Sequence, residues 1–148
     1  MSIGLSKAVA QKLTKADFSM GILKIDSQFN SLELSRQFGA LRKVDRFTDS
    51  LRSSAPDIYF TYAYDSVTVV VLGSYVNYYE TTKRTLVTRR GVRIGDTEEK
   101  VRRLYGKPSE DDWLECGLSY FKYHSMLGLS FCVEKGIVVK IIVGWGSC

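Results

Sequence analysis

The side chains best suited to catalysis in this sequence are a single histidine and three cysteines. His124 lies beside Ser125, and an imidazole next to a hydroxyl or thiol can act as the base of a nucleophilic pair. The partners of such a pair meet in space rather than in sequence, so an enzyme remains an alternative. However, no acidic residue neighbours His124, and its segment has the composition of a surface turn. We therefore expect a non-enzymatic protein with no catalytic residue.

The cysteines, Cys116, Cys132 and Cys148, indicate neither a disulfide framework nor a metal site. Their number is odd, and no pair has the CxxC spacing of zinc ligands. Cys116 and Cys132 fall on strands that we expect to be neighbours, as a diagonal pair. Diagonal neighbours lie about 7–8 Å apart, which is long for a disulfide. The sequence thus predicts free thiols and no bound metal.

The acidic residues and glycines indicate no cofactor. Glu98–Glu99 lie where a helix begins, and Asp111–Asp112 lie in a polar connection. The second pair lacks the alternating ligands and central glycine of a calcium loop. Neither a GxGxxG nor a GK[ST] phosphate-binding motif occurs in the chain. We expect no cofactor.

Tyrosine is the residue type that most favours a binding function. Six of the nine tyrosines lie within 21 residues, on segments with the two-residue period of strands. Tyrosine offers a large contact area at low entropic cost and is enriched where interfaces carry their energy, although it also suits strands in general. Because successive strand residues face opposite sides, about half of the six should point into the core. The candidate contact residues are Tyr59, Tyr62, Tyr64, Tyr75, Tyr78 and Tyr79.

Basic residues follow directly after these tyrosines. Residues 83–107 contain nine lysines and arginines and three acids, whereas the whole chain carries a net charge of +5. Such a cluster attracts nucleic-acid phosphates, an anionic membrane or an acidic partner, although a solvated helix and loop have the same composition. Aromatic rings beside basic side chains also hold single-stranded nucleic acid. The candidate basic residues are Lys83, Arg84, Arg89, Arg90 and Arg93.

The elements that position these residues follow from hydrophobic periodicity and turn residues. Residues 2–16 have the apolar spacing of an amphipathic helix. A second helix begins at Asp26 or Ser31 and ends at Gly39, since glycine accepts a left-handed backbone cheaply. The polar segment 43–57 predicts a loop or a short helix. Strands are expected after Gly91 and at 22–25, 58–64, 67–72, 75–82 (continuing toward Thr88), 118–123, 126–133 and 137–143.

The segment GVRIGDTEEKVRRLYGKP, residues 91–108, has the most complete helix signals. Asp96 and Glu99 are spaced as a capping box, Gly106 is placed to end the helix, and Pro108 prevents its continuation. The segment resembles the signature of small bacterial domains that include the outer-membrane assembly lipoprotein BamE (SmpA/OmlA type) and β-lactamase inhibitory protein. This resemblance implies helices against an antiparallel sheet, as a tandem repeat in the inhibitor type, and a function in binding other proteins. No leader or lipid-attachment cysteine is expected near the start of this sequence, unlike in the exported members, and we therefore expect no outer-membrane role.

The expected fold class is α+β, with helices packed on one face of an antiparallel sheet. A length of 148 residues with 45% hydrophobic residues predicts a single domain, 1–148. The two halves, 21–88 and 91–148, can be overlaid as a tandem repeat of a helix followed by three strands. No signal peptide or transmembrane segment is expected, which predicts a cytoplasmic chain, or an exported one if a leader has been removed.

Two functions remain in view. The first is a non-enzymatic protein-binding domain, an inhibitor or assembly factor, that uses an open tyrosine-rich sheet face. The alternative is a nucleic-acid-binding protein that uses the basic region 83–107.

Overall fold

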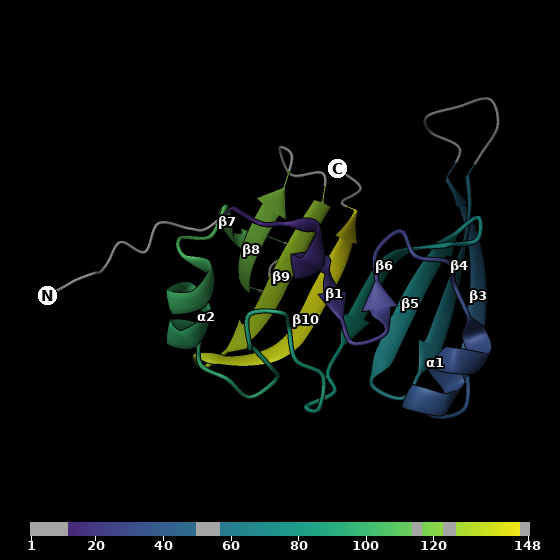
Figure 1. Cartoon of the computed structure of the whole chain (residues 1–148), viewed down its shortest axis with the longest axis horizontal. Coiled ribbons are helices and arrows are strands. Elements are labelled where there is room, and N and C mark those ends of the chain that lie inside the picture. Colours follow the sequence, from purple (N-terminus) through teal and green to yellow (C-terminus); the bar gives the residue numbers. More distant parts are fainter. Residues whose placement is uncertain (1–11, 50–56, 114–116, 123–126, 146–148) are drawn as a thin grey trace, which may run out of the picture.

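The computed structural model describes residues 12–49, 57–113, 117–122 and 127–145. Within these residues an eight-stranded antiparallel sheet runs through the molecule (Figure 1). Its strands are β3 (Lys43–Asp49), β4 (Asp57–Tyr64), β5 (Val67–Leu72), β6 (Tyr75–Thr81), β7 (Glu110–Trp113), β8 (Gly117–Lys122), β9 (Leu127–Glu134) and β10 (Ile137–Trp145).

The strand order is β3-β4-β5-β6-β10-β9-β8-β7, so each half of the chain builds one half of the sheet. Within each half, strands that are consecutive in sequence pair as antiparallel neighbours. The two halves meet where β6 pairs with β10, with Thr81 opposite Ile141 and Tyr79 opposite Val143. We call this β6–β10 pairing the seam.

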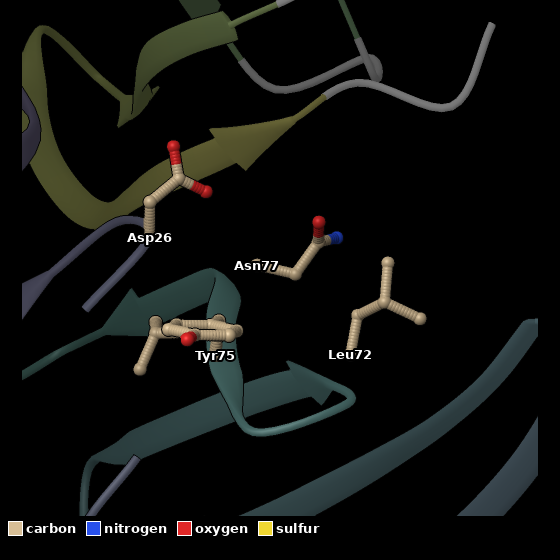
Figure 2. Close-up of a pocket in the computed structure, with 5 residues that line it drawn as sticks. Asp26, Leu72, Tyr75 and Asn77 are labelled. Carbon is tan, nitrogen blue, oxygen red and sulfur yellow. The ribbon is translucent and has the colours of Figure 1, made fainter. Parts of the chain in front are cut away.

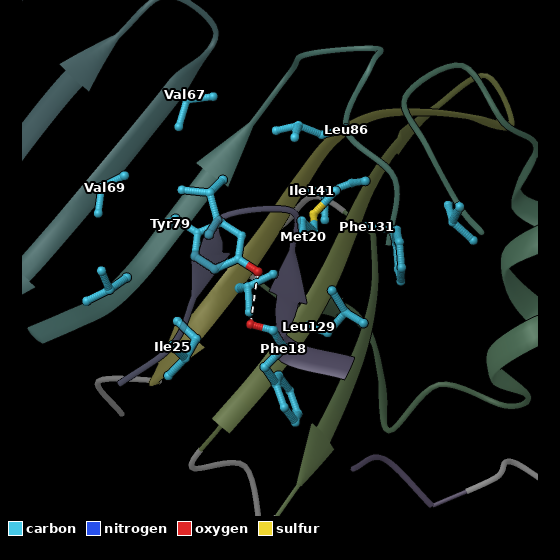
Figure 3. Packing of buried hydrophobic residues seen from close by; sticks show 14 of the residues in the cluster. Phe18, Met20, Ile25, Val67, Val69, Tyr79, Leu86, Leu129, Phe131 and Ile141 are labelled. Atoms are coloured by element: carbon cyan, nitrogen blue, oxygen red, sulfur yellow. Dashed lines mark hydrogen bonds between the residues drawn. The ribbon is translucent and has the colours of Figure 1, made fainter. Parts of the chain in front are cut away.

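One face of the sheet is covered by short elements, and the hydrophobic core lies beneath them. They are the helices α1 (Ser31–Phe38) and α2 (Glu98–Tyr105), the 3-10 helix η2 (Lys15–Phe18), and the two-stranded ribbon of β1 (Ser19–Met20) and β2 (Leu23–Lys24). Figure 3 shows Phe18 and Met20 packed with Leu129, Phe131 and Ile141 of the sheet. The phenol of Tyr79, which is fully buried, donates a hydrogen bond of 3.0 Å to the carbonyl of Phe18. We call this side of the sheet the core face.

The predicted ends of both helices are confirmed. Gly39 ends α1 at φ 89°, and Gly106 ends α2 at φ 82°, a backbone region that favours glycine. At the N-terminal ends, each capping residue is the neighbour of a predicted one, Ser31 for α1 and Asp96 for α2. Asn30 caps α1 by accepting from the backbone N–H of Glu33, and Thr97 caps α2 by accepting from that of Lys100.

The predicted fold class, helices packed on one face of an antiparallel sheet, is wrong. The described residues are mostly sheet, and the two α-helices have only eight residues each. A ribbon, a 3-10 helix and a loop contribute as much of the cover as the helices do. Each half also has four strands of the large sheet after its helix rather than three. That the halves 21–88 and 91–148 are repeats stays a prediction.

Several predicted elements also differ from the structure. Residues 43–57 contain the strand β3 instead of a loop or helix, and the acidic connection after Pro108 contains the strand β7. No strand lies between Gly91 and the start of α2. The strand β6 ends at Thr81 instead of continuing toward Thr88. The helix predicted over 2–16 falls mainly outside the described residues, and its described end contains only the start of η2.

Candidate functional site

The strand register sorts the six clustered tyrosines between the two faces of the sheet. Tyr62 and Tyr64 pair with Val69 and Val67, which are buried in the core, so these two tyrosines lie on the core face. Tyr59 pairs with Leu72 and therefore lies on the opposite face. We call this opposite face, over β3 to β6, the open face, because the described helices and β1–β2 pack against the core face.

A β-bulge in β6 places two further tyrosines on the open face. The register shifts between Val70 and Val71, so that Val71 faces Val76 while Val70 faces Tyr78, and Asn77 is the extra residue. Tyr75 pairs with Leu72 and shares the open face with Tyr78. Tyr79 then points into the core. A bulge of this kind re-aims the side chains that follow it.

The open face thus presents an aromatic and aliphatic surface. The rings of Phe47 and Tyr59 stack across β3 and β4, with centroids 4.9 Å apart and planes 6° apart. Phe47 is 46% exposed and Tyr75 is 56% exposed, while the other members are partly buried. Its residues are Phe47, Tyr59, Val70, Leu72, Tyr75 and Tyr78.

Four of the charged groups that flank this surface form two ion pairs. Lys43 and Asp45 of β3 form an ion pair of 3.4 Å, and Glu80 and Lys140 form one of 3.1 Å at the seam. The phenol of Tyr78 donates to Glu80 at 3.1 Å. Burial, with the added negative charge of Glu80, raises the pKa of the Tyr78 phenol well above its ordinary value, so this group is a neutral donor. These groups therefore add little net charge to the open face, whereas Asp57, exposed at the start of β4 and two residues before Tyr59, lies on the same face and is negative.

The core-face tyrosines pack with the core and are not part of the open face. Tyr64 is buried, and its hydroxyl lies 3.1 Å from that of Ser31 at the start of α1. Tyr62 packs on the ring of Phe29 at 4.3 Å between centroids. Burial raises the pKa of the Tyr79 phenol, which is already bonded to the backbone. Of the six predicted contact residues, the structure brings Tyr59, Tyr75 and Tyr78 together.

The predicted basic residues lie apart from these tyrosines. They belong to the connection between β6 and α2, whose side chains Leu86, Val92 and Ile94 pack in the core cluster. This connection therefore lies on the core side of the sheet, and Arg84, Arg89 and Arg93 are exposed there while Lys83 is partly buried. The structure does not build one surface from the open-face tyrosines and these arginines.

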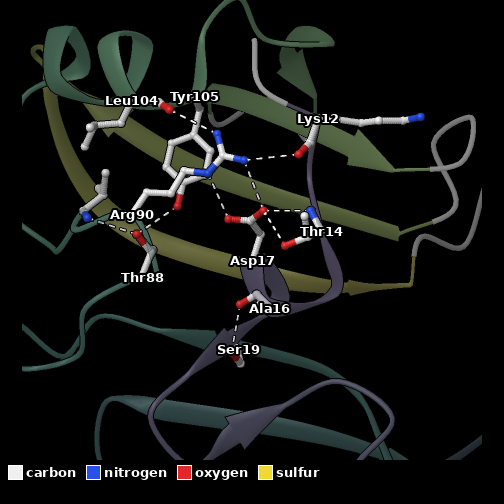
Figure 4. A network of polar contacts seen from close by, with 10 residues as sticks. Lys12, Thr14, Ala16, Asp17, Ser19, Thr88, Arg90, Leu104 and Tyr105 are labelled. Atoms are coloured by element: carbon white, nitrogen blue, oxygen red, sulfur yellow. Dashed lines mark hydrogen bonds and ion pairs between the residues drawn. The ribbon is translucent and has the colours of Figure 1, made fainter.

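Arg90 has a structural role, which Figure 4 shows. Its guanidinium donates to the buried carboxylate of Asp17 from Nε at 2.9 Å and from Nη2 at 3.1 Å. Nη1 donates to the carbonyl of Leu104 at 3.1 Å, and the guanidinium lies 4.8 Å from the ring centroid of Tyr105. The pair ties η2 to the end of α2, so Arg90 serves the fold and is not part of a contact surface.

A hollow with a volume of about 390 Å³ opens at the end of the β5–β6 hairpin, beside the open face (Figure 2). It shares Leu72 and Tyr75 with that face and is completed by Asp26, Val76 and Asn77. No local sequence signal places Asp26 in a site, because its partners Val76 and Trp145 are far away along the chain. Phe47 was missed for a different reason, since its strand has too few apolar residues to show a strand period.

The residues first considered for chemistry form no catalytic arrangement in the described part of the chain. His124, Cys116 and Cys148 lie outside the described residues. Cys132 is buried and disulfide-bonded, so the expectation of a free thiol is wrong for this residue. Among the described residues, no cluster of histidine, cysteine or acidic side chains could hold a metal ion.

Comparisons with known proteins identify no family. No family model and no curated protein sequence matches the chain, so the likeness to BamE and to β-lactamase inhibitory protein stays a prediction. Among solved structures, the uncharacterized protein yfeY from Escherichia coli is similar over 86% of this chain and 97% of its own, at 11% identity and a TM-score of 0.47. So distant a likeness says nothing about function. None of the described helices is long and apolar enough to span a bilayer.

Proposed function

We propose that this chain is a protein-binding domain whose contact surface is the open face. The observation that supports it is the set of aromatic and aliphatic side chains on β3 to β6, opposite the face that holds the core. Exposed apolar surface of this kind, when it is contiguous and rimmed by polar residues, marks interaction sites in soluble proteins.

The chemistry of the open face suits a protein partner better than a nucleic acid. Its centre consists of tyrosine, phenylalanine and aliphatic side chains, and both lysines that flank it are neutralised in the Lys43–Asp45 and Glu80–Lys140 pairs. Interface cores are depleted of charge and enriched in aromatic residues, with a polar rim that excludes water. Nucleic-acid surfaces instead need unpaired positive charge beside the aromatic rings.

The rigidity of the surface also favours binding. Tyr59 is stacked on Phe47, and Tyr78 is bonded to Glu80, so both rings are held before a partner arrives. Side chains that are already ordered lose less entropy when they are buried in a complex.

Site-specific photo-crosslinking in cells tests this function. A photoreactive phenylalanine analogue is placed at Tyr59 or Tyr75 on the open face, and at Arg89 or at Gln37 of α1 as controls. We expect a discrete protein adduct from the two open-face positions and none from the controls. Adducts confined to Arg89, adducts with nucleic acid, or no protein adduct at the open face would each overturn the proposal.

Once the partner is purified, its affinity measures the role of individual rings. Tyr78→Ala should weaken binding by about 2 kcal/mol, as expected for an aromatic residue at the centre of an interface. Arg89→Ala is the matched control and should leave the affinity unchanged. The affinity should also vary little with salt concentration, because the interface contains few ion pairs of the kind that a nucleic acid would form.

A further inference from the structure

The hollow at the end of the β5–β6 hairpin is lined by four kinds of chemical group. In Figure 2 the carboxylate of Asp26, the amide of Asn77 and the aliphatic side chain of Leu72 lie around one opening, with the ring of Tyr75 beside them. Tyr75 is the most exposed ring of the open face, at 56%. A charged acceptor, a neutral amide, an aromatic face and an apolar wall therefore meet in one place.

The backbone holds Asp26 in place for this role. Asp26 has a left-handed backbone, with φ 65°, which is uncommon outside glycine but tolerated by aspartate and asparagine. Its N–H donates to the carbonyl of Val76 at 2.8 Å, and the N–H of Val76 donates to the carbonyl of Ser27 at 2.9 Å. The segment around Asp26 is thus fixed to the start of β6, and the carboxylate has a defined position.

The carboxylate of Asp26 keeps acceptor capacity for a ligand. Its Oδ1 accepts a hydrogen bond of 3.1 Å from the indole Nε1 of Trp145 in β10. Asp26 has no ion pair within the described part of the chain, and a carboxylate offers about four acceptor sites. A positive group in the hollow would meet an oriented, uncompensated negative charge.

From these features we infer that the hollow receives an arginine or lysine side chain of the partner protein. The apolar stem of such a side chain packs against Leu72, as the stems of long basic residues do on apolar surfaces. Its charged head bonds to Asp26 and lies by the ring of Tyr75, which attracts cations through its face. The inference rests on the proposed function, because the hollow adjoins the open face and would add charge selection to a largely apolar contact.

Small probes test the hollow without the partner. Capped arginine and capped lysine are titrated into the full chain, with capped norleucine as the neutral probe that shares the aliphatic stem, at equal ionic strength. The readout is the NMR signal of the Trp145 indole N–H, assigned with a Trp145→Phe variant. We expect a saturable shift with the two charged probes, in the millimolar range of affinity, and none with norleucine.

Asp26→Asn is the matched variant. Asparagine keeps the acceptor for Trp145 and accepts the left-handed backbone, so the fold should be retained while the charge is lost. Its affinity for the charged probes should fall about tenfold, since a hydrogen bond to a charged group is lost. Asp57→Asn, at the exposed start of β4, is the control and should bind as the unchanged chain does.

Equal shifts with all three probes, no shift with the charged ones, or an unchanged affinity in Asp26→Asn would each overturn the inference. These results are independent of the partner, whereas the crosslinking pattern decides whether the open face binds a protein at all. The failure of the hollow and the failure of the proposed function are thus distinguishable.

Discussion

Asp17 and Arg90 form the most deeply buried ion pair of the described residues (Figure 4). Besides the two bonds from Arg90, the carboxylate accepts the backbone N–H of Thr14 at 2.8 Å. Arg90 in turn donates to the carbonyls of Leu104 and Lys12. A single pair therefore joins three segments that are distant in sequence. The hydrophobic pattern gives no sign of such a pair, because only the fold brings its members together.

Removing the charge of Asp17 should destabilise the protein strongly. Asp17→Asn leaves the guanidinium of Arg90 buried without its counter-charge, and breaking a buried pair in this way costs about 3–5 kcal/mol. Urea unfolding followed by circular dichroism measures the change. The matched control is Asp65→Asn, because Asp65 pairs with Arg42 at 3.6 Å on the surface, with more than half of each side chain exposed. Such exposed pairs contribute little, so equal losses in the two variants would contradict this role.

The same pair predicts how stability depends on pH. Burial by itself would raise the pKa of Asp17, but the bonds from Arg90 and Thr14 outweigh it and hold the pKa below its usual value. A carboxylate with a lowered pKa stabilises the fold above its unfolded pKa of about 3.9, and this contribution is lost as the pH falls through the folded value. The stability difference between the unchanged chain and Asp17→Asn should therefore be constant near neutral pH and shrink below about pH 4. Urea midpoints across this range test it, and a constant difference at all pH values would refute it.

At the scale of the elements, the seam depends on a glycine. A Cβ added to Gly144 in β10 would lie 2.8 Å from the Cα of Tyr78 and 2.9 Å from the carbonyl oxygen of Asn77. Both are backbone atoms, so the strands would have to separate. Glycine at this position allows β6 and β10 to approach at the bulge.

Gly144→Ala should thus destabilise the fold by about 1–3 kcal/mol, the usual cost of overpacking. Gly128→Ala is a matched comparison in β9, because its added Cβ would meet the ring of Phe121 at 2.9 Å, and a side chain can move where backbone cannot. Thermal unfolding should show the larger loss for Gly144→Ala. The opposite order would show that the backbone at the seam adjusts easily.

Local sequence signals predict some elements of this fold and miss others for a physical reason. The helix ends at Gly39 and Gly106 and the central strands were predictable, since their signals lie within a few residues. The strands β3 and β7 were not, because each is an edge strand that has a neighbour on one side only. An edge strand can be polar, as β3 is, so apolar alternation does not reveal it. The predicted fold class is wrong because it contains too much helix and lacks the edge strands β3 and β7.

The candidate site was predictable only in part for a similar reason. Strand alternation correctly divides the tyrosines of β4, with Tyr59 opposite to Tyr62 and Tyr64. In β6, alternation alone would place Tyr75 and Tyr79 on one face. The bulge at Asn77 separates them, and nothing local in the sequence marks its position. The open face and the hollow beside it therefore required the structure.

At the scale of the whole molecule, the disulfide at Cys132 corrects the expectation of free thiols. A disulfide uses two of the three cysteines. When the protein is unfolded without reductant, a thiol-reactive dye should thus label one cysteine per chain. After reduction it should label all three. Labelling of all three without reductant would contradict the disulfide.

Reduction should also weaken the fold. The loss of a native disulfide from a small domain typically costs about 2–5 kcal/mol, since the unfolded chain gains freedom. Urea unfolding with and without reductant measures it, and Cys132→Ser gives the same comparison without a reagent. An unchanged midpoint in both would show that the sheet is stable without the cross-link.

The position of the seam has a consequence for how the chain folds. Each strand pairing in the large sheet joins strands that are neighbours in sequence, except that between β6 and β10. Pairings between neighbours close short loops and form quickly, whereas a pairing across a long stretch of chain carries a larger entropic cost. The meanders β3–β6 and β7–β10 can therefore assemble early as separate units. We therefore expect their joining to be the slow step of folding, which substitutions at the seam should slow more than substitutions elsewhere in the sheet.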